Sequence, residues 1–187
     1  MARWDPGARQ RLQIAALELY VRQGFEKTTV EEIAQSVGLT ERTFFRHFAD
    51  KREVLFDGHD MLQQAFLDGV RAAPPSASPL EMVTAALAVS AESFTDERRP
   101  WSRQRHAVIT ANPGLLEREL LKRASLAAVV AGALRARGVA ERAAVLAAET
   151  GVTVFNVAFS EWITEDEQRS LAEVEREVLE ELKALAA

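Results

Sequence analysis

The stretch from residue 28 to residue 51 constrains the fold more than any other part of the chain. Thr29 and Glu32 have the spacing of a capping box, in which a hydroxyl and a carboxylate each accept a hydrogen bond from the other residue's backbone N–H. Apolar residues then recur at helical spacing up to Gly38, where a left-handed backbone conformation can end a helix. Thr40 is placed to cap a second helix. The sequence therefore predicts two short helices joined by a tight turn.

The second predicted helix has an apolar side, formed by Phe44, Phe45 and Phe48, and a polar side of hydroxyls and cations. Two helices joined by a short glycine-containing turn form a helix-turn-helix, whose second helix enters the DNA major groove. Arginine can read guanine bidentately, and hydroxyls bind phosphate oxygens. The residues that we predict to contact DNA are Thr28, Thr29, Thr40, Arg42, Thr43, Phe45, Arg46, His47 and Lys51. Among them, Arg42 and Thr43 are the predicted base readers, and His47 and Lys51 are placed to hold a phosphate.

The same segment resembles the TetR family of bacterial transcription regulators. The residues that stand at the family's spacing are Gly24-Phe25, Thr28-Thr29-Val30, Ile33-Ala34, Val37-Gly38, Thr40, Thr43, His47-Phe48 and Lys51. The resemblance is strong over residues 8–60, whereas the rest of the chain matches in helical character and length. It implies a sequence-specific DNA-binding transcriptional regulator, a repressor that a small-molecule effector releases from a palindromic operator.

Phe45 departs from the family's pattern. The family usually has tyrosine at this position, and the tyrosine hydroxyl often contacts a phosphate. Since Phe45 cannot donate a hydrogen bond, the resemblance implies that this contact is lost, or that Arg42 or Arg46 replaces it.

The chain is predicted to be all-α, with about nine helices in two domains. Residues 1–56 form a three-helix DNA-binding head, and residues 57–187 form a helical body for ligand binding and dimerisation. A helix from about residue 51 to residue 71 joins them, and the proline-containing linker 72–79 follows it. The net charge of −5 does not exclude DNA binding, because the body carries the acidic excess and only one face needs cations.

Two strongly apolar helices are predicted at the end of the chain, over about 140–163 and 165–185, with Thr164 and Glu167 as the capping box of the second. In a monomer these helices would leave a sizeable apolar patch exposed to water. We therefore predict a homodimer joined through both helices in a four-helix interface. A twofold dimer would present two recognition helices to half-sites about one DNA turn apart.

The resemblance also implies a small-molecule pocket in the body, between residues 80 and 160. Its candidate lining residues are Phe94, Trp101, His106, Phe155, Asn156 and Phe159. Core packing is the alternative for the aromatic residues, since aromatics at helical spacing fill cores more often than they line pockets. Five arginines could bind an anionic effector or could form a solvated helix face: Arg98, Arg99, Arg103, Arg105 and Arg118.

Several classes of function are not expected. The chain has no cysteine, which excludes a disulfide framework and thiolate sites. It has no phosphate-binding glycine loop, nucleophile motif or cluster of metal ligands, so we expect no enzyme, catalytic residue, metal or cofactor. Without a signal peptide or a run of 18 apolar residues, a cytoplasmic location and no membrane contact are expected. The alternatives to a regulator are an enzyme and a helical interaction protein whose head has lost DNA binding.

Overall fold

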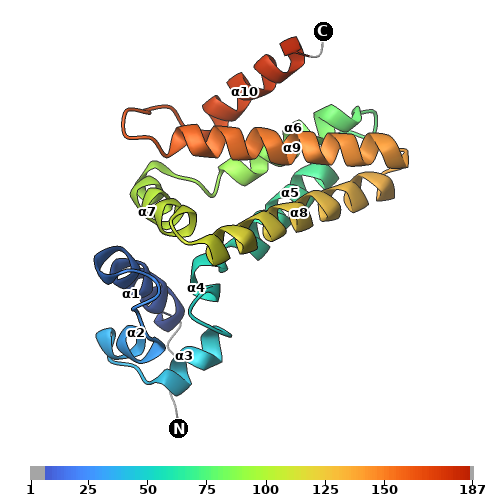
Figure 1. Cartoon of the computed structure of the whole chain (residues 1–187). Coiled ribbons are helices and arrows are strands. Elements are labelled where there is room, and N and C mark those ends of the chain that lie inside the picture. Colours follow the sequence, from blue (N-terminus) through green and yellow to red (C-terminus); the bar gives the residue numbers. More distant parts are fainter. Residues whose placement is uncertain (1–6, 186–187) are drawn as a thin grey trace. The chain divides into compact units, whose positions relative to one another are not determined.

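The computed structural model describes residues 7–185, and every regular element among them is helical (Figure 1). Contacts divide the chain into two compact units. Of the described residues, the head unit comprises those up to Gly58 together with Gln104–Glu119, and the body unit comprises His59–Arg103 together with those from Leu120 onward. The predicted all-α fold is confirmed. The domain boundary after residue 56 remains a prediction, because contacts also assign 104–119 to the head unit.

The helices are distributed over both units. Those of the head unit are α1 (Ala8–Gln23), α2 (Val30–Ser36), α3 (Glu41–His47) and α4 (Glu53–Phe56). Those of the body unit are α5 (His59–Ala72), α6 (Pro79–Ala91), the short 3-10 helix η1 (Asp96–Arg98), α9 (Glu141–Trp162) and α10 (Leu171–Leu185). Two further helices, α7 (Arg99–Thr110) and α8 (Pro113–Ala136), contribute residues to both units.

The head unit is built around α1, which packs against α2 and α4, while α2 packs against α3. Leu12 of α1, Ile33 of α2 and Phe44 of α3 are completely buried in its core. Gly38 lies between α2 and α3 with φ +70°, a left-handed conformation in which residues with a Cβ are strained. The predicted pair of short helices with a glycine turn is therefore present.

The single helix predicted over residues 51–71 is wrong, because the structure has two helices, α4 and α5, separated at Asp57 and Gly58. The Asp57 carboxylate accepts hydrogen bonds from the Arg9 and Gln13 side chains of α1, which ties this point of the chain to the head core. Glycine has a low helix propensity, which favours the interruption of the helix at this point. The Asp50 carboxylate, just before α4, accepts from the backbone N–H of Glu53 at 3.0 Å.

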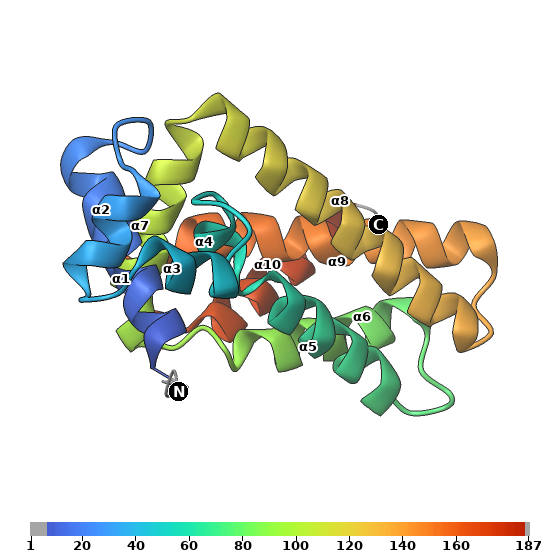
Figure 2. The same cartoon turned by 90° about the horizontal axis from the view of Figure 1, so that it is seen from below.

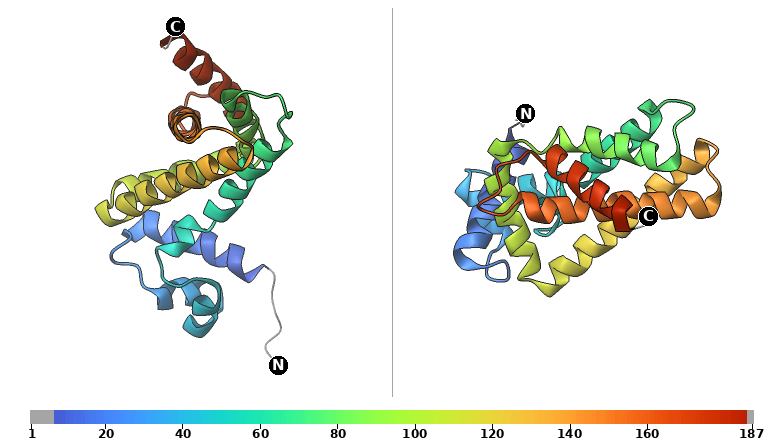
Figure 3. Two further views of the ribbon diagram at one scale, coloured as in Figure 1. Left: turned by 90° about the vertical axis from the view of Figure 1, so that its right-hand side faces the viewer. Right: turned by 90° about the horizontal axis from the view of Figure 1, so that it is seen from above.

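The body unit has a core of small and aromatic side chains. In this core α5 and α6 lie side by side (Figure 2), and they approach so closely that a Cβ on Gly69 would lie 2.4 Å from the Ala86 Cα. The left view of Figure 3 looks along α9, which packs against α6 and α10. Val154 and Trp162 of α9 are completely buried.

The start of the last helix differs from the prediction. The structure begins α10 at Leu171, where the Ser170 hydroxyl accepts from the Glu173 backbone N–H at 3.3 Å and the Glu173 carboxylate accepts from the Ser170 backbone N–H at 2.8 Å. The predicted box at Thr164 is wrong, because its glutamate is used elsewhere. The Glu167 carboxylate accepts from the backbone N–H of Arg169 at 2.7 Å, which forms a turn in place of a helix start.

Helix α9 is long and apolar enough to cross a membrane by length and composition, a property that no other helix of residues 7–185 shares. Half of its apolar stretch is buried inside the structure. Since its buried side chains pack on α6 and α10, core packing explains why the sequence is so apolar.

Candidate nucleic-acid interface

The α2–turn–α3 segment has the capping pattern that the sequence predicts. The Thr29 hydroxyl accepts from the Glu32 backbone N–H at 3.1 Å, and the Glu32 carboxylate accepts from the Thr29 backbone N–H at 2.8 Å. This backbone hydrogen bond is also the main cause that lowers the pKa of Glu32. The Thr40 hydroxyl accepts from the Thr43 backbone N–H at 3.3 Å and lies 3.1 Å from the Thr43 hydroxyl. Both short helices therefore begin at fixed points.

Helix α3 turns one side into the head core and exposes the other. Phe44 and Phe48 are buried, and their ring centroids are 5.5 Å apart. The prediction that Phe45 belongs to this apolar side is wrong, because its side chain is 52% exposed. In the seven-residue helix α3, position 45 is rotated about 100° away from position 44, while Phe48 follows the helix as its C-cap.

Two arginines on the outer side of α3 are available for a ligand. Arg42 and Arg46 are exposed, and neither makes a hydrogen bond or an ion pair with any residue in the described range 7–185. Thr43 is half-buried beside them. An unneutralised pair of guanidinium groups on a helix that is anchored from behind suits contact with DNA phosphates and base edges.

Lys51 has a different position from the predicted phosphate clamp. Its Nζ donates to the backbone carbonyls of Phe25, Glu26 and Thr28 at 2.9, 3.3 and 2.9 Å, and it lies 4.5 Å from the centroid of the Phe25 ring. An ammonium group has three N–H donors, so all of them are used inside the head unit. The backbone carbonyl of Lys51 accepts from the Tyr20 hydroxyl at 2.6 Å. Lys51 therefore holds the α1–α2 loop and does not face a phosphate in this conformation.

Thr28 is also placed inside the protein. It is 1% exposed, and its hydroxyl donates to the Gly24 carbonyl at 2.8 Å. The structure thus removes it from the predicted DNA-contacting set. His47 is half-buried at the end of α3, and its contact with DNA remains a prediction.

Each of the five arginines proposed as an anion site or a solvated face contacts a group of the protein itself, although Arg98 is exposed and donates to the nearby Ser93 carbonyl. Arg105 and Arg118 belong to the head unit, where Arg105 donates to the Leu55 carbonyl and Arg118 pairs with Glu53 of α4. Arg98, Arg99 and Arg103 belong to the body unit. Arg99 and Arg103 donate to the backbone carbonyls of residues 163–169, which satisfies the end of α9 and the loop after it. Sequence spacing gave no signal for these distant carbonyl partners.

Three of the predicted pocket residues, Phe94, Phe155 and Phe159, form an aromatic cluster with Trp162 in the body unit. The Phe94 ring lies 5.6 Å from Phe155, 5.7 Å from Phe159 and 5.9 Å from Trp162, measured between centroids, with steeply inclined planes. Phe155 and Phe159 are buried, so these rings fill the core in the present conformation. The other candidates are dispersed: Trp101 and Asn156 are half-buried in the body unit, and His106 belongs to the head unit.

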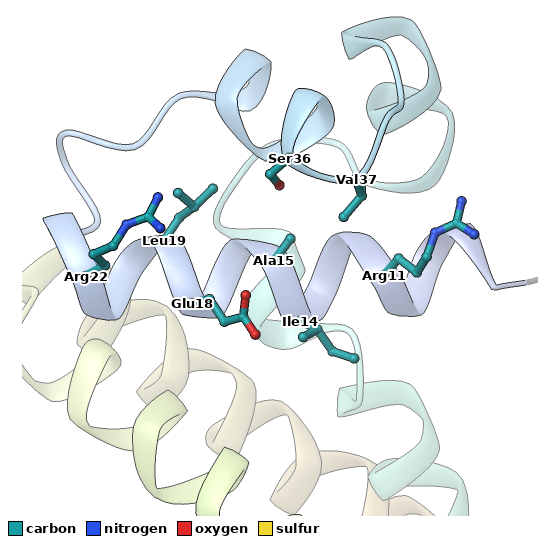
Figure 4. A pocket seen from close by; sticks show the side chains of 8 residues that line it. All are labelled: Arg11, Ile14, Ala15, Glu18, Leu19, Arg22, Ser36 and Val37. Carbon is teal, nitrogen blue, oxygen red and sulfur yellow. The ribbon is translucent and has the colours of Figure 1, made fainter.

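A shallow groove of about 240 Å³ lies beside α1 and α2 in the head unit (Figure 4). Its lining residues are Arg11, Ile14, Ala15, Glu18, Leu19, Arg22, Ser36 and Val37. None of the residues predicted to contact DNA or an effector lines it. No group of His, Asp or Glu side chains able to hold a metal ion occurs between residues 7 and 185.

Comparison with known proteins agrees with this geometry. Residues 14–57 match the family described as bacterial regulatory proteins, tetR family, and residues 77–187 match the family described as the MftR C-terminal domain. The chain is 43% identical over 89 residues to the HTH-type transcriptional regulator TcmR of Streptomyces glaucescens, an alignment that covers 43% of this chain and 39% of TcmR. It is 29% identical over 103 residues to MftR of Mycobacterium tuberculosis, named as a regulator of mycofactocin biosynthesis, covering 54% of this chain and 50% of MftR. The chain thus spans half or less of these curated relatives.

A solved structure matches over a greater length. Thermus thermophilus FadR, described as a TetR-family transcriptional repressor in complex with lauroyl-CoA, superposes with a TM-score of 0.56 and 24% identity, covering 94% of this chain and 93% of FadR. At this identity the likeness supports the fold alone. The two family matches together cover residues 14–57 and 77–187, which include most of the head unit and most of the body unit. The chain belongs to the TetR family of bacterial transcriptional regulators, which bind DNA and are not enzymes.

Proposed function

We propose that this regulator is a repressor that binds a palindromic operator as a homodimer and leaves it when a small-molecule effector binds the body unit. The observation that carries the proposal is the outer face of α3, where Arg42 and Arg46 have no partner within the described chain. Arg42 and Thr43 read bases, while Arg46 and the hydroxyls of Thr29 and Thr40 contact phosphates.

DNA binding is tested with duplexes from the region upstream of the gene and with a selection from random sequences. Binding should weaken steeply as salt rises, because phosphate contacts release counterions. Arg42→Ala should relax base preference at one position of each half-site, at a cost of about 1–3 kcal/mol, while Arg46→Ala should weaken binding to all sequences alike. Arg71→Ala removes an exposed arginine of α5 and is the matched control. A wild-type chain that binds no duplex in either experiment would refute the proposal.

The proposed dimer interface is the outer face of α9. Leu146 and Val157 of α9 are 62% and 49% exposed, which is unfavourable for large apolar side chains facing water. The outward side of α10 carries Glu177, Glu180 and Glu181, so α10 supports the interface at its polar rim. Sedimentation of Val157→Glu should give a monomer, whereas Thr84→Glu, at an exposed position of α6, should leave the dimer intact. A dimer that survives Val157→Glu together with Leu146→Glu would contradict this interface.

The proposed effector is an apolar or amphipathic small molecule that enters the aromatic cluster around Phe94. Support comes from the composition of that cluster and from the match to FadR, whose structure contains lauroyl-CoA. An effector that lowers DNA affinity must, by linkage, bind the DNA-free protein more tightly. Titration of the protein–operator complex with lauroyl-CoA and shorter acyl-CoAs tests this class, and a change in tryptophan fluorescence that is absent from Trp162→Phe reports occupancy of the cluster. A cytoplasmic location is part of the proposal, because the operator is there.

A further inference from the structure

Phe45 is an exposed aromatic side chain that the folding of the head unit does not explain. Its side chain is 52% exposed, although Phe44 beside it on α3 and Phe48 directly after α3 are buried. The ring contact recorded for it is an edge-on approach to Phe44, with centroids 5.5 Å apart and planes at 84°. An exposed phenylalanine on a short polar helix face contributes little hydrophobic stabilisation to the fold. Its ring is therefore available for a contact outside the monomer.

The position of Phe45 is fixed by its neighbours. Phe44 and Phe48 anchor α3 in the head core, and the Arg9 guanidinium lies 5.0 Å from the centroid of the Phe48 ring. The Thr40 cap fixes the first turn of α3. The Phe45 ring is therefore carried on a helix that is held at its start and from behind.

The chemistry of the ring limits what it can contact on DNA. A phenyl group has no donor or acceptor, so it cannot bind a phosphate or the polar edge of a base. The one apolar group that the major groove presents is the C5-methyl of thymine, and phenylalanine is among the residues that contact it. Phe45 lies three residues after the exposed Arg42, which places both side chains on the same face of α3.

We infer that Phe45 is a specificity-determining residue that packs on the methyl group of one thymine in each half-site. This inference rests on the proposed operator binding. Three residues span about 4.5 Å along a helix, and successive bases are about 3.4 Å apart, so the thymine lies within one or two base steps of the base that Arg42 reads.

The test uses the operator duplex selected from random sequences, with each thymine replaced in turn by deoxyuridine. This replacement removes the methyl group and leaves the base-pairing groups unchanged. For the wild-type chain, one replacement in a half-site should reduce affinity about fourfold, and the symmetrical pair about fifteenfold, as expected for one methyl group per contact. Replacement of the other thymines should have no effect.

Phe45→Ala identifies the residue responsible. In this variant the sensitive deoxyuridine replacement should cause no further loss, since the interacting partner is already absent. Val21→Ala truncates an equally exposed apolar residue of α1 and should leave the fourfold effect intact. If Phe45→Ala does not fold, the same comparison is made with Phe45→Asn, and circular dichroism reports folding.

Three results would overturn the inference. The first is a wild-type chain that binds the operator but tolerates deoxyuridine at every thymine. The second is a deoxyuridine effect of equal size in wild type and Phe45→Ala, which would show that another residue contacts the methyl. The third is the failure of the wild-type chain to bind any duplex, which removes the proposed function and this inference together.

Discussion

Glu175 gives the sharpest prediction about stability. This carboxyl group lies on α10 and is 3% exposed, and its Oε1 has no hydrogen-bond partner among residues 7–185. Desolvation disfavours the charged form and raises the pKa of Glu175 from 4.5 to about 8. The folded protein therefore holds a neutral acid at pH 7, while the unfolded chain releases that proton.

The sign and size of the effect follow from linkage. Because the folded pKa is raised, the stability is fully present below about pH 4.5 and is lost as the pH rises towards 8. The loss at pH 7 is about 3 kcal/mol, and it levels off near 5 kcal/mol above the folded pKa. Glu175→Gln has nearly the same shape and no ionisation. It should equal the wild type at pH 4 and be more stable by about 3 kcal/mol at pH 7.

Urea unfolding from pH 4 to pH 9, at constant protein concentration and followed by tryptophan fluorescence, measures the free energy of unfolding of both proteins. Glu181→Gln removes an exposed carboxylate from the same helix and should show no such pH-dependent gap. The reasoning would be refuted by a gap between Glu175→Gln and wild type that stays constant with pH. It would also be refuted by a variant that is less stable than wild type at pH 7.

Three further substitutions test contacts that position the helices. Lys51→Met leaves three backbone carbonyls without their donor, which should destabilise the protein by about 2 kcal/mol and lower its melting temperature. An unchanged melting temperature would contradict this role of Lys51. Ser170→Ala removes the cap of α10 and should cost about 1 kcal/mol in urea unfolding, whereas Thr164→Ala should cost less. Arg105→Ala breaks both the hydrogen bond to the Leu55 carbonyl and the ion pair with Glu119, and should cost about 2 kcal/mol. Recovery by Arg105→Lys would show that the forked geometry is not needed.

Capping and turn residues in the sequence correctly predicted the helix ends that are fixed by residues close by in the chain. The cap at Thr40 and the turn at Gly38 were correct, because each uses atoms within about four residues. The capping-box pattern gave a wrong helix start at Thr164. Thr164 with Glu167 and Ser170 with Glu173 have the same spacing, so the sequence pattern does not show which pair begins the helix. The choice between them depends on arginines of α7 that bind the α9–α10 loop about 60 residues away, which sequence spacing does not reveal.

The sequence predicted where the candidate DNA-contacting surface lies, but it predicted less well which residues belong to it. Spacing identified α3 as the recognition helix and Arg42 as exposed, because a helix that buries Phe44 must turn other positions outward. The position of Lys51 was not predictable, since its three carbonyl partners lie more than 20 residues earlier in the chain. Phe45 was assigned both to the apolar side of α3 and to the DNA-contacting residues, and its apolar character gave no means of choosing between the two.

The arginines of this chain explain why charge alone does not locate the DNA-contacting surface. Arg137 donates to the carbonyls of Val70 and Pro74 at the end of α5, and Arg103 and Arg105 do the same for α9 and α4. A guanidinium group suits this task, since it has five donors and remains charged at any working pH, whereas helix C-termini leave carbonyls without partners. Arginines used in this way are anchored inside the protein and add little to the attraction of DNA. The residues that matter for recognition are found by the opposite criterion, which Arg42 meets: an exposed guanidinium group with no partner in the described chain, on a helix that is fixed from behind.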